Sequence, residues 1–263
     1  MSKPAGKCVF CGEPGVTHGH VWPDWLNKIL PRTATHHEEI NGELLTFTPD
    51  IPVLPKSKTL REGQTRSRKP RNTCGGCNGG WMSGIEHTAI PFATPLIQGA
   101  SVVLTPHAQQ ALASFLCLVV MRLEFLGKAR MIPMQERLQL KQTRTPPNNW
   151  KIWVARFTGN PDDHASHRCS IQLSTGDNLP PPNKVGLEYC NAQTSTIVLG
   201  NLCAHLFSSA EPIMDGYEGV SLTRLWPLTG LSIQSDFIPA IDGTTLVWLQ
   251  EALVRETPSR SPS

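Results

Sequence analysis

The chain has 263 residues, of which 39% are hydrophobic and 17% charged, so it can bury a core over one or two domains. Its formal net charge of +3 is too small to indicate a partner by itself. No apolar stretch near the N-terminus resembles a signal peptide, and the most apolar segment, residues 111–121, is too short to span a bilayer. We therefore expect a protein of the cytoplasm or nucleoid, with no membrane partner. In such a reducing compartment, cysteines are more often metal ligands than disulfides.

The first 95 residues contain two Cys-x-x-Cys pairs and most of the basic clustering, with little hydrophobic periodicity. Beyond them, apolar side chains at steps of three and four residues predict a long helix over residues 106–127. A second helix is expected over residues 134–142. This change of pattern divides the chain into a zinc module, residues 1–95, and a second domain, residues 96–263.

The second domain is predicted to mix helices with strands. Short alternating or β-branched runs after Pro146 predict strands at residues 150–157, 168–173 and 194–199. Residues 244–254 are expected to form a closing helix. The fold class predicted for the whole chain is therefore α+β.

The two Cys-x-x-Cys pairs are Cys8 with Cys11 and Cys74 with Cys77. Two intervening residues let both thiolates of a turn point at one ion, and two such turns complete a tetrahedron. Thiolates suit both zinc and iron–sulfur clusters, but short glycine-containing turns favour a single structural zinc ion. Unrelated buried thiols and a redox dithiol are the alternatives. The remaining four cysteines lack this spacing and are expected in the core: Cys117, Cys169, Cys190 and Cys203.

Two further segments carry a resemblance to a known family. Thr17-His18-Gly19-His20-Val21-Trp22-Pro23-Asp24-Trp25-Leu26 lies between the Cys pairs, and Asn78-Gly79-Gly80-Trp81-Met82-Ser83-Gly84-Ile85-Glu86 follows the second pair. Together with the cysteines, these segments resemble the zinc-containing HNH, or His-Me finger, endonucleases. The resemblance covers about the first ninety residues. It implies a ββα-metal module, in which two strands and a helix grip one catalytic divalent cation, and a short helix after the histidines that buries its tryptophan.

The resemblance also implies roles for particular residues. His20 matches the general base that deprotonates the attacking water. Asn78 matches a ligand of the catalytic cation, which would be magnesium, manganese or nickel. Asn72 is the nearest candidate for the asparagine that orients the base. Gly19 stands where the family usually has an acidic metal ligand, so this chain lacks one carboxylate.

Two more side chains are candidate ligands of that cation. His18 is two positions before His20, so on a continuous strand both would point to the same face. Glu86 lies eight residues beyond Asn78, about two helical turns, and is expected to approach the same helix face. The alternative for each is a structural role near the zinc turns.

A basic segment precedes the second Cys pair. Between residues 56 and 71, seven cations and one acid give a net charge of +6, which suits contact with a phosphate backbone. No aromatic residue is interleaved, so stacking on single-stranded bases is not indicated. The expected partner is DNA, without excluding RNA, and the alternative is a solvated loop. The cations are Lys56, Lys58, Arg61, Arg66, Arg68, Lys69 and Arg71.

Three functions compete on these grounds. The first is an HNH-like endonuclease that hydrolyses DNA phosphodiester bonds with a divalent cation. The second is a zinc-scaffolded nucleic-acid-binding protein whose catalytic site has decayed, as Gly19 would allow. The third is a zinc-stapled module for protein interaction. The sequence of residues 96–263 adds no mechanism.

Overall fold

The computed structural model describes residues 6–30, 36–41, 57–62, 69–126, 130–159, 164–171, 192–209, 217 and 220–255. The strands are β1 (Val16–His18), β2 (His36–Asn41), β3 (Ser57–Glu62), β4 (Arg71–Cys74), β5 (Val103–Leu104), β6 (Trp150–Phe157), β7 (His164–Ile171), β8 (Ala192–Leu199), β9 (Leu202–Ser209), β10 (Thr223–Trp226), β11 (Ile233–Gln234) and β12 (Ala240–Ile241). The helices are α1 (Leu26–Ile29), α2 (Gly75–Cys77), α3 (Ser83–Gln98), α4 (Pro106–Leu123), α5 (Met134–Thr143) and α6 (Gly243–Arg255).

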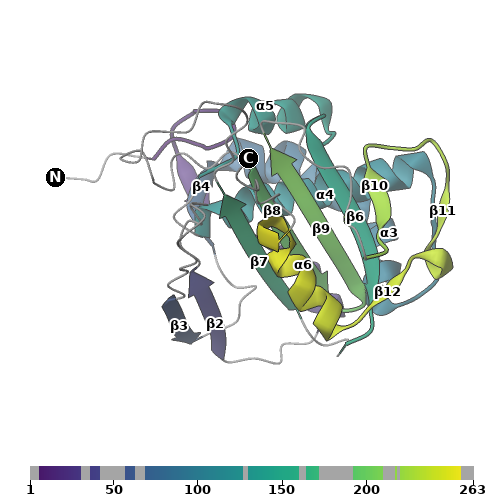
Figure 1. The fold of residues 1–263 in the computed structure, drawn as a ribbon. Helices are drawn as coiled ribbons and strands as arrows, with labels where there is room; N and C mark the ends of the chain where they lie inside the picture. The colour runs from purple at the N-terminus through teal and green to yellow at the C-terminus, as the bar shows by residue number, and fades with distance from the viewer. Residues whose placement is uncertain are drawn as a thin grey trace, which may run out of the picture.

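A six-stranded sheet forms the largest element of the fold (Figure 1). Its order is β10-β6-β9-β8-β7, all antiparallel, and β12 pairs with β6 in parallel. Every residue of β8 and β9 is buried, so these central strands are covered on both faces. Long runs of buried residues are typical of strands between two layers.

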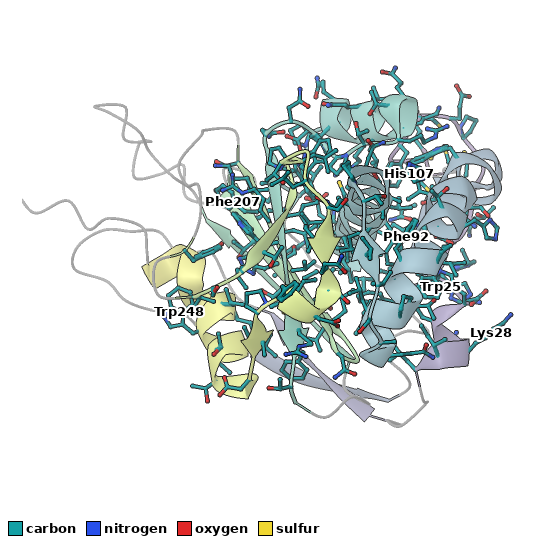
Figure 2. All side chains as sticks on the ribbon, turned by 90° about the vertical axis from the view of Figure 1, so that its right-hand side faces the viewer. Trp25, Lys28, Phe92, His107, Phe207 and Trp248 are labelled. Atoms are coloured by element: carbon teal, nitrogen blue, oxygen red, sulfur yellow. The ribbon has the colours of Figure 1, made fainter. Side chains whose placement is uncertain are left out.

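Helices cover the two faces of this sheet. Figure 2 shows α6, which carries Trp248, on one side of the sheet and the layer of α3 and α4 on the other. A small core beneath α6 includes Phe157, Val198 and Leu249. A much larger core lies on the other side and contains most of α4.

The helix α4 is the centre of the larger core. The side chain of Thr105 caps it by accepting a hydrogen bond from the backbone N–H of Ala108, and Pro106 opens the helix, where its missing N–H costs nothing. Within the described part of the chain, residues 106–126 form the one helical stretch long and apolar enough to cross a membrane by length and composition. Most of that stretch is buried inside the protein, as expected for a core helix.

The N-terminal part is built on β1 and β4, which pair antiparallel. The chain then runs from β4 through α2 and a wide helical turn at Asn78–Met82 into α3. The backbone is not helical at Gly80, where the two helical segments meet at a kink. Separately, β2 and β3 form an antiparallel pair. The candidate site described below is built on β1, β4 and the start of α3.

Most of the predicted elements are confirmed. The helix expected over residues 106–127 is α4 with a 3₁₀ turn at Glu124–Leu126, and the one expected over 134–142 is α5. The strand expected at 150–157 is β6, with the same bounds, and the closing helix is α6. The mixed helix and strand class of the chain is therefore as predicted.

Three expectations need correction. The strand expected at 168–173 begins earlier, at His164. The basic segment is not a continuous loop, because Ser57–Glu62 forms β3. The tryptophan expected to be buried by the short helix, Trp25, is only half-buried and lies just before α1, whereas Trp22 is buried. Residues 257–263, expected to be a disordered tail, lie outside the described residues.

The division into residues 1–95 and 96–263 remains a prediction. The boundary falls inside α3, and the larger core is continuous from Phe10 near the first Cys pair to Leu225 on β10. Packing therefore joins the two predicted parts through α3 and α4.

Candidate metal centre and its neighbourhood

The four cysteines of the two Cys-x-x-Cys pairs lie together. The sulfur atoms of Cys8, Cys11, Cys74 and Cys77 all lie within 4.8 Å of one another, and 3.6 Å separates the Sγ atoms of Cys11 and Cys74. Four sulfurs at 2.3 Å from one zinc ion would be about 3.8 Å apart, so the donor set fits a single tetrahedral zinc. The predicted cluster is confirmed as a group of cysteines that can hold a metal ion.

Backbone hydrogen bonds fold both pairs into turns. The N–H of Gly12 donates to the carbonyl of Cys8 over 2.8 Å, and the N–H of Cys77 donates to the Sγ of Cys74 over 3.4 Å. Gly12 has φ +77°, a left-handed conformation that glycine adopts without strain. The N–H of Val9 bonds the carbonyl of Asn72 over 2.9 Å, which joins the first turn to β4.

Two aromatic residues, Phe10 and Trp81, belong to the same core as the cysteines. Phe10 and Trp81 contact each other edge to face, with ring centroids 5.4 Å apart, and Phe10 is fully buried. Burial raises the pKa of the Cys77 thiol to about 12, although the neighbouring Trp81 opposes this rise. A bound zinc ion would reverse the effect of burial, because it binds the thiolate.

The Cys8 thiol has the opposite shift. Burial raises its pKa, but hydrogen bonds from the backbone of Cys74, Phe10 and Cys11 outweigh burial and lower the pKa to about 7. Backbone N–H groups aimed at sulfur stabilise a thiolate, as in zinc turns. These N–H groups therefore favour the thiolate at Cys8, whereas burial raises the pKa of its partner Cys11.

The two histidines occupy different environments. β1 ends at His18, so His20 lies beyond the strand and the expectation that both share a strand face is wrong. A register shift after Thr17 shows where the strand pairing becomes irregular. His18 is exposed and its Nδ1 lies 3.3 Å from the carbonyl of Lys69. His20 is half-buried, with a side chain 27% exposed.

Two contacts define the state of the His20 imidazole. Its Nε2 lies 3.3 Å from Oδ1 of Asp24, while its Nδ1 is buried without a hydrogen-bond partner among the described residues. Burial lowers the pKa of His20, and Lys69 and Arg122 lower it further, against the opposing effect of Asp24. The imidazole is therefore neutral at neutral pH. Nε2 is therefore the nitrogen that faces the Asp24 carboxylate, and Nδ1 is the buried nitrogen.

Asn78 and Glu86 share one buried arginine. Arg122 on α4 donates from Nη2 to Oδ1 of Asn78 over 2.5 Å and from Nη1 to Oε1 of Glu86 over 2.8 Å. Its side chain is 3% exposed, and a contact of 3.4 Å joins Nη2 to Sδ of Met82. Asn78 and Glu86 thus both bind one guanidinium, which lies between their oxygen atoms.

Gly19 faces the same place. A Cβ added at Gly19 would lie 3.4 Å from Oδ1 of Asn78 and 3.9 Å from Cβ of Thr73. A side chain at position 19 would thus point toward Asn78, and glycine leaves this position without a carboxylate.

The residues of this site do not fit a divalent cation. Gly19 offers no oxygen, and the oxygens of Asn78 and Glu86 that would serve as ligands accept hydrogen bonds from Arg122. A guanidinium beside these oxygens also repels a second cation. His18, the other candidate ligand, points to solvent beside Lys69.

No hydrogen bond joins Asn72 to His20 among the described residues. Its Oδ1 accepts a hydrogen bond from the hydroxyl of Thr73 over 3.0 Å, and its carbonyl binds the N–H of Val9 in the first Cys turn. Asn72 is buried on β4 and supports the cysteine cluster. No orienting contact to His20 is seen for it.

The basic segment is described in part. Lys69 and Arg71 are exposed, and Arg71 is paired with His18 across β1 and β4. Lys58 and Arg61 are on β3, where only the backbone is described. Lys56, Arg66 and Arg68 lie outside the described residues.

Arg122 belongs to this site although no sequence motif indicates it. It belongs to the predicted helix 106–127 and interrupts its apolar pattern. A charged residue within an otherwise apolar helix indicates an ion pair, because a buried charge needs a partner. The identity of that partner requires the packing of α3 on α4.

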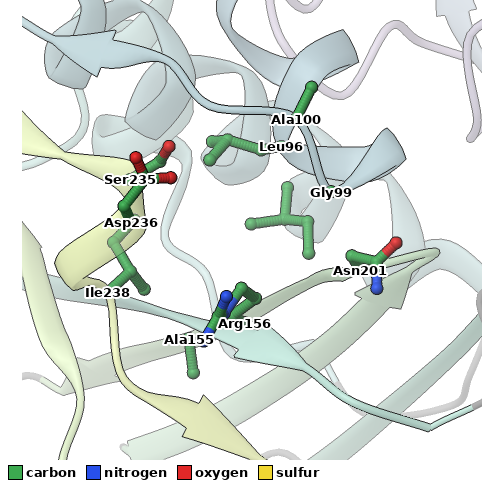
Figure 3. A pocket seen from close by; sticks show the side chains of 10 residues that line it. Leu96, Gly99, Ala100, Ala155, Arg156, Asn201, Ser235, Asp236 and Ile238 are labelled. Carbon is green, nitrogen blue, oxygen red and sulfur yellow. The ribbon is translucent and has the colours of Figure 1, made fainter.

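A small pocket lies elsewhere, between the end of α3, β6 and the segment after β11 (Figure 3). Its volume is about 30 Å³, room for about one water molecule. Gly99, Arg156, Asn201 and Asp236 are among its lining residues. None of the residues that the sequence predicts as functional lines it.

Comparisons with known proteins place no further constraint on the site, since no protein family, curated protein or solved structure matches this chain.

Proposed function

We propose that this chain is a zinc-stabilised, HNH-like protein that binds the phosphate backbone of DNA. The observation that carries the proposal is the position of the exposed cations Lys69 and Arg71 beside the histidine motif. His18 lies next to both cations. Its Nδ1 is 3.3 Å from the carbonyl oxygen of Lys69, and it is the strand partner of Arg71.

The cysteine cluster explains why these groups lie together. Zinc bound by both pairs would tie the loop after Cys11 to the end of β4, and β1 pairs with β4 directly before Cys74. The end of the basic segment is thereby fixed next to His18 and His20. Cations on a rigid edge contact phosphates with a smaller loss of side-chain entropy than cations on a free loop.

The state of His20 favours binding over hydrolysis. A general base needs an accessible lone pair, whereas Nδ1 of His20 is buried and Nε2 faces Asp24. The site also lacks the acidic ligand at Gly19. Both features support the decayed form of an HNH site.

Endonuclease activity is the second candidate, because His20 is neutral at neutral pH and Gly19 faces Asn78 in the arrangement that the family resemblance implies. The side chain of Asp24 is 75% exposed, so its contact with His20 is weak and a substrate could displace it. Hydrolysis would then require the neutral imidazole to carry its proton on Nδ1, so that the freed Nε2 accepts a proton from water as the water oxygen attacks phosphorus and the ester oxygen leaves.

The first test measures binding of the zinc-loaded protein to duplex DNA by fluorescence anisotropy at several salt concentrations. We expect the Lys69→Ala/Arg71→Ala double variant to bind roughly tenfold more weakly and to lower the salt slope by about 1 to 2. The matched control removes two cations elsewhere, with Lys141→Ala/Arg156→Ala. Equal effects of both double variants, or no DNA binding at all, would contradict the proposal, and the latter would favour a protein-interaction module.

The second test separates binding from cleavage. Supercoiled plasmid is incubated with the zinc-loaded protein and with magnesium, manganese, nickel or no added metal. We expect binding without nicking. Nicking that is lost in His20→Ala, with the zinc content unchanged, would establish the endonuclease instead.

A further inference from the structure

The space between Asn78 and Glu86 already holds a positive charge. The guanidinium of Arg122 binds Oδ1 of Asn78 and Oε1 of Glu86 through two different nitrogens, at 2.5 and 2.8 Å. We propose that Arg122 is the resident cation of this site, held by Asn78 and Glu86 in the place of a divalent metal ion. The site then takes no divalent cation while Arg122 is present.

The charges of the buried groups support this assignment. Glu86 contributes one negative charge, Arg122 one positive charge and Asn78 none, so the group is neutral as it stands. Adding a divalent cation would leave two uncompensated positive charges in a site where Arg122 is 3% exposed. The further charged groups that act on Glu86 are His87, which supplies no negative charge, and Asp24, which is exposed.

Gly19 and Arg122 belong to one arrangement. A side chain at position 19 would point toward the Asn78 oxygen that Arg122 binds. A carboxylate at that position would add the missing ligand, but in the presence of Arg122 it would pair with the guanidinium. Metal binding therefore requires two changes, a carboxylate at position 19 and removal of the charge at position 122.

Packing explains how an arginine can reach this place. Arg122 is in the last turn of α4, the helix that packs against α3, and Glu86 is in the first turn of α3. Asn78 lies one helical segment earlier, before the kink at Gly80. The guanidinium thus connects α4 with α3 and with the helical turn at Asn78–Met82.

The experiment measures manganese binding to the zinc-loaded protein by the loss of the free Mn²⁺ signal in electron paramagnetic resonance. The variants are wild type, Gly19→Asp, Gly19→Asp/Arg122→Gln and Gly19→Asp/Arg122→Lys. We expect Gly19→Asp/Arg122→Gln to bind Mn²⁺ at least about tenfold more tightly than wild type. The other two variants should bind Mn²⁺ no more tightly than wild type does. Adding Asn78→Ala to Gly19→Asp/Arg122→Gln should abolish the binding.

Several results would overturn the inference. One is Mn²⁺ binding by wild type that Asn78→Ala abolishes, since the site would then accept a metal beside Arg122. Another is equal binding by the Lys- and Gln-containing double variants, since the charge would then be irrelevant. A folded, zinc-loaded Gln variant that binds no Mn²⁺ would also refute it.

If the Gln variant does not fold, wild type with and without Asn78→Ala gives the answer, because binding that depends on Asn78 refutes the inference and no binding supports it. The assay contains no nucleic acid. This inference can therefore fail while the proposed DNA binding stands, and the reverse is also true.

Discussion

Arg122 and Glu86 form a buried ion pair, with 2.8 Å between Nη1 and Oε1, that joins the C-terminal turn of α4 to the N-terminal turn of α3. Burial raises the pKa of Glu86, and the neighbouring Arg122 opposes that rise. Removing one partner of a buried pair leaves an uncompensated charge, which costs more than the pair contributes. The contact thus ties the candidate site to the core helix.

We expect Glu86→Ala to lower the free energy of unfolding by about 3 kcal/mol, since it leaves Arg122 buried without its carboxylate. Urea unfolding followed by circular dichroism measures this. Glu86→Gln, which keeps an acceptor for Arg122, should cost less. Glu13→Ala removes an exposed carboxylate and should change stability by less than about 0.5 kcal/mol. A cost below about 1 kcal/mol for Glu86→Ala would mean that water reaches Arg122.

The cysteine cluster predicts one zinc ion per chain, measured by elemental analysis of the purified protein. Cys77→Ser should lose the zinc and lower the Tm by about 10 °C or more, because metal binding contributes directly to folding. Cys117→Ala is the control, since Cys117 is buried in α4 away from the cluster and should leave the zinc content unchanged. Full zinc content in Cys77→Ser would exclude the four-cysteine site.

The pKa of His20 is expected below its ordinary value of 6.5, since burial disfavours the imidazolium. The unfolded chain then binds a proton near pH 6.5 that the folded chain does not. Stability should therefore decrease as the pH falls through 6.5 toward the folded pKa. A pH titration of the His20 ring proton by NMR measures the shift.

Two variants test the causes of that shift in opposite directions. Asp24→Asn removes a charge that favours the imidazolium and should lower the pKa of His20 further. Lys69→Gln removes a charge that disfavours it and should raise the pKa. Shifts of the same sign in both variants would show that the charges act only through a change of conformation.

Gly99 ends α3 in a left-handed conformation, φ +72°, and a Cβ there would lie 3.0 Å from Oδ1 of Asn201. Gly99→Ala should therefore lower the free energy of unfolding by about 1 to 2 kcal/mol. Gly84→Ala is the matched control within α3, where no atom lies near the added Cβ. It should raise stability by up to about 1 kcal/mol, because alanine favours helix over glycine. Equal changes in the free energy of unfolding for Gly99→Ala and Gly84→Ala would contradict this role of Gly99 at the end of α3.

The helix α3 shows where prediction from local pattern stops. The helix expected around Asn78 and Glu86 continues to Gln98 although Pro91 and Pro95 lie inside it, where proline normally kinks or ends a helix. The helix forms because its buried face, which includes Ile85, Ala89 and Ala93, packs on α4. Tertiary packing overrides the local preference of proline, and a short window of sequence carries no information on that packing.

By itself, the sequence determined the features that depend on local spacing: the two cysteine turns, the apolar helix α4, the strand β6 and the closing helix α6. The grouping of His20, Gly19 and Asn78 into one motif remains a prediction, although position 19 does face Asn78. Only the tertiary structure decided what lies between Asn78 and Glu86. Arg122 comes from 36 residues beyond Glu86, and its burial is determined by the packing of α4 against α3. A buried charge must find its partner in space, so the choice between a metal ion and a guanidinium depends on packing and not on the motif.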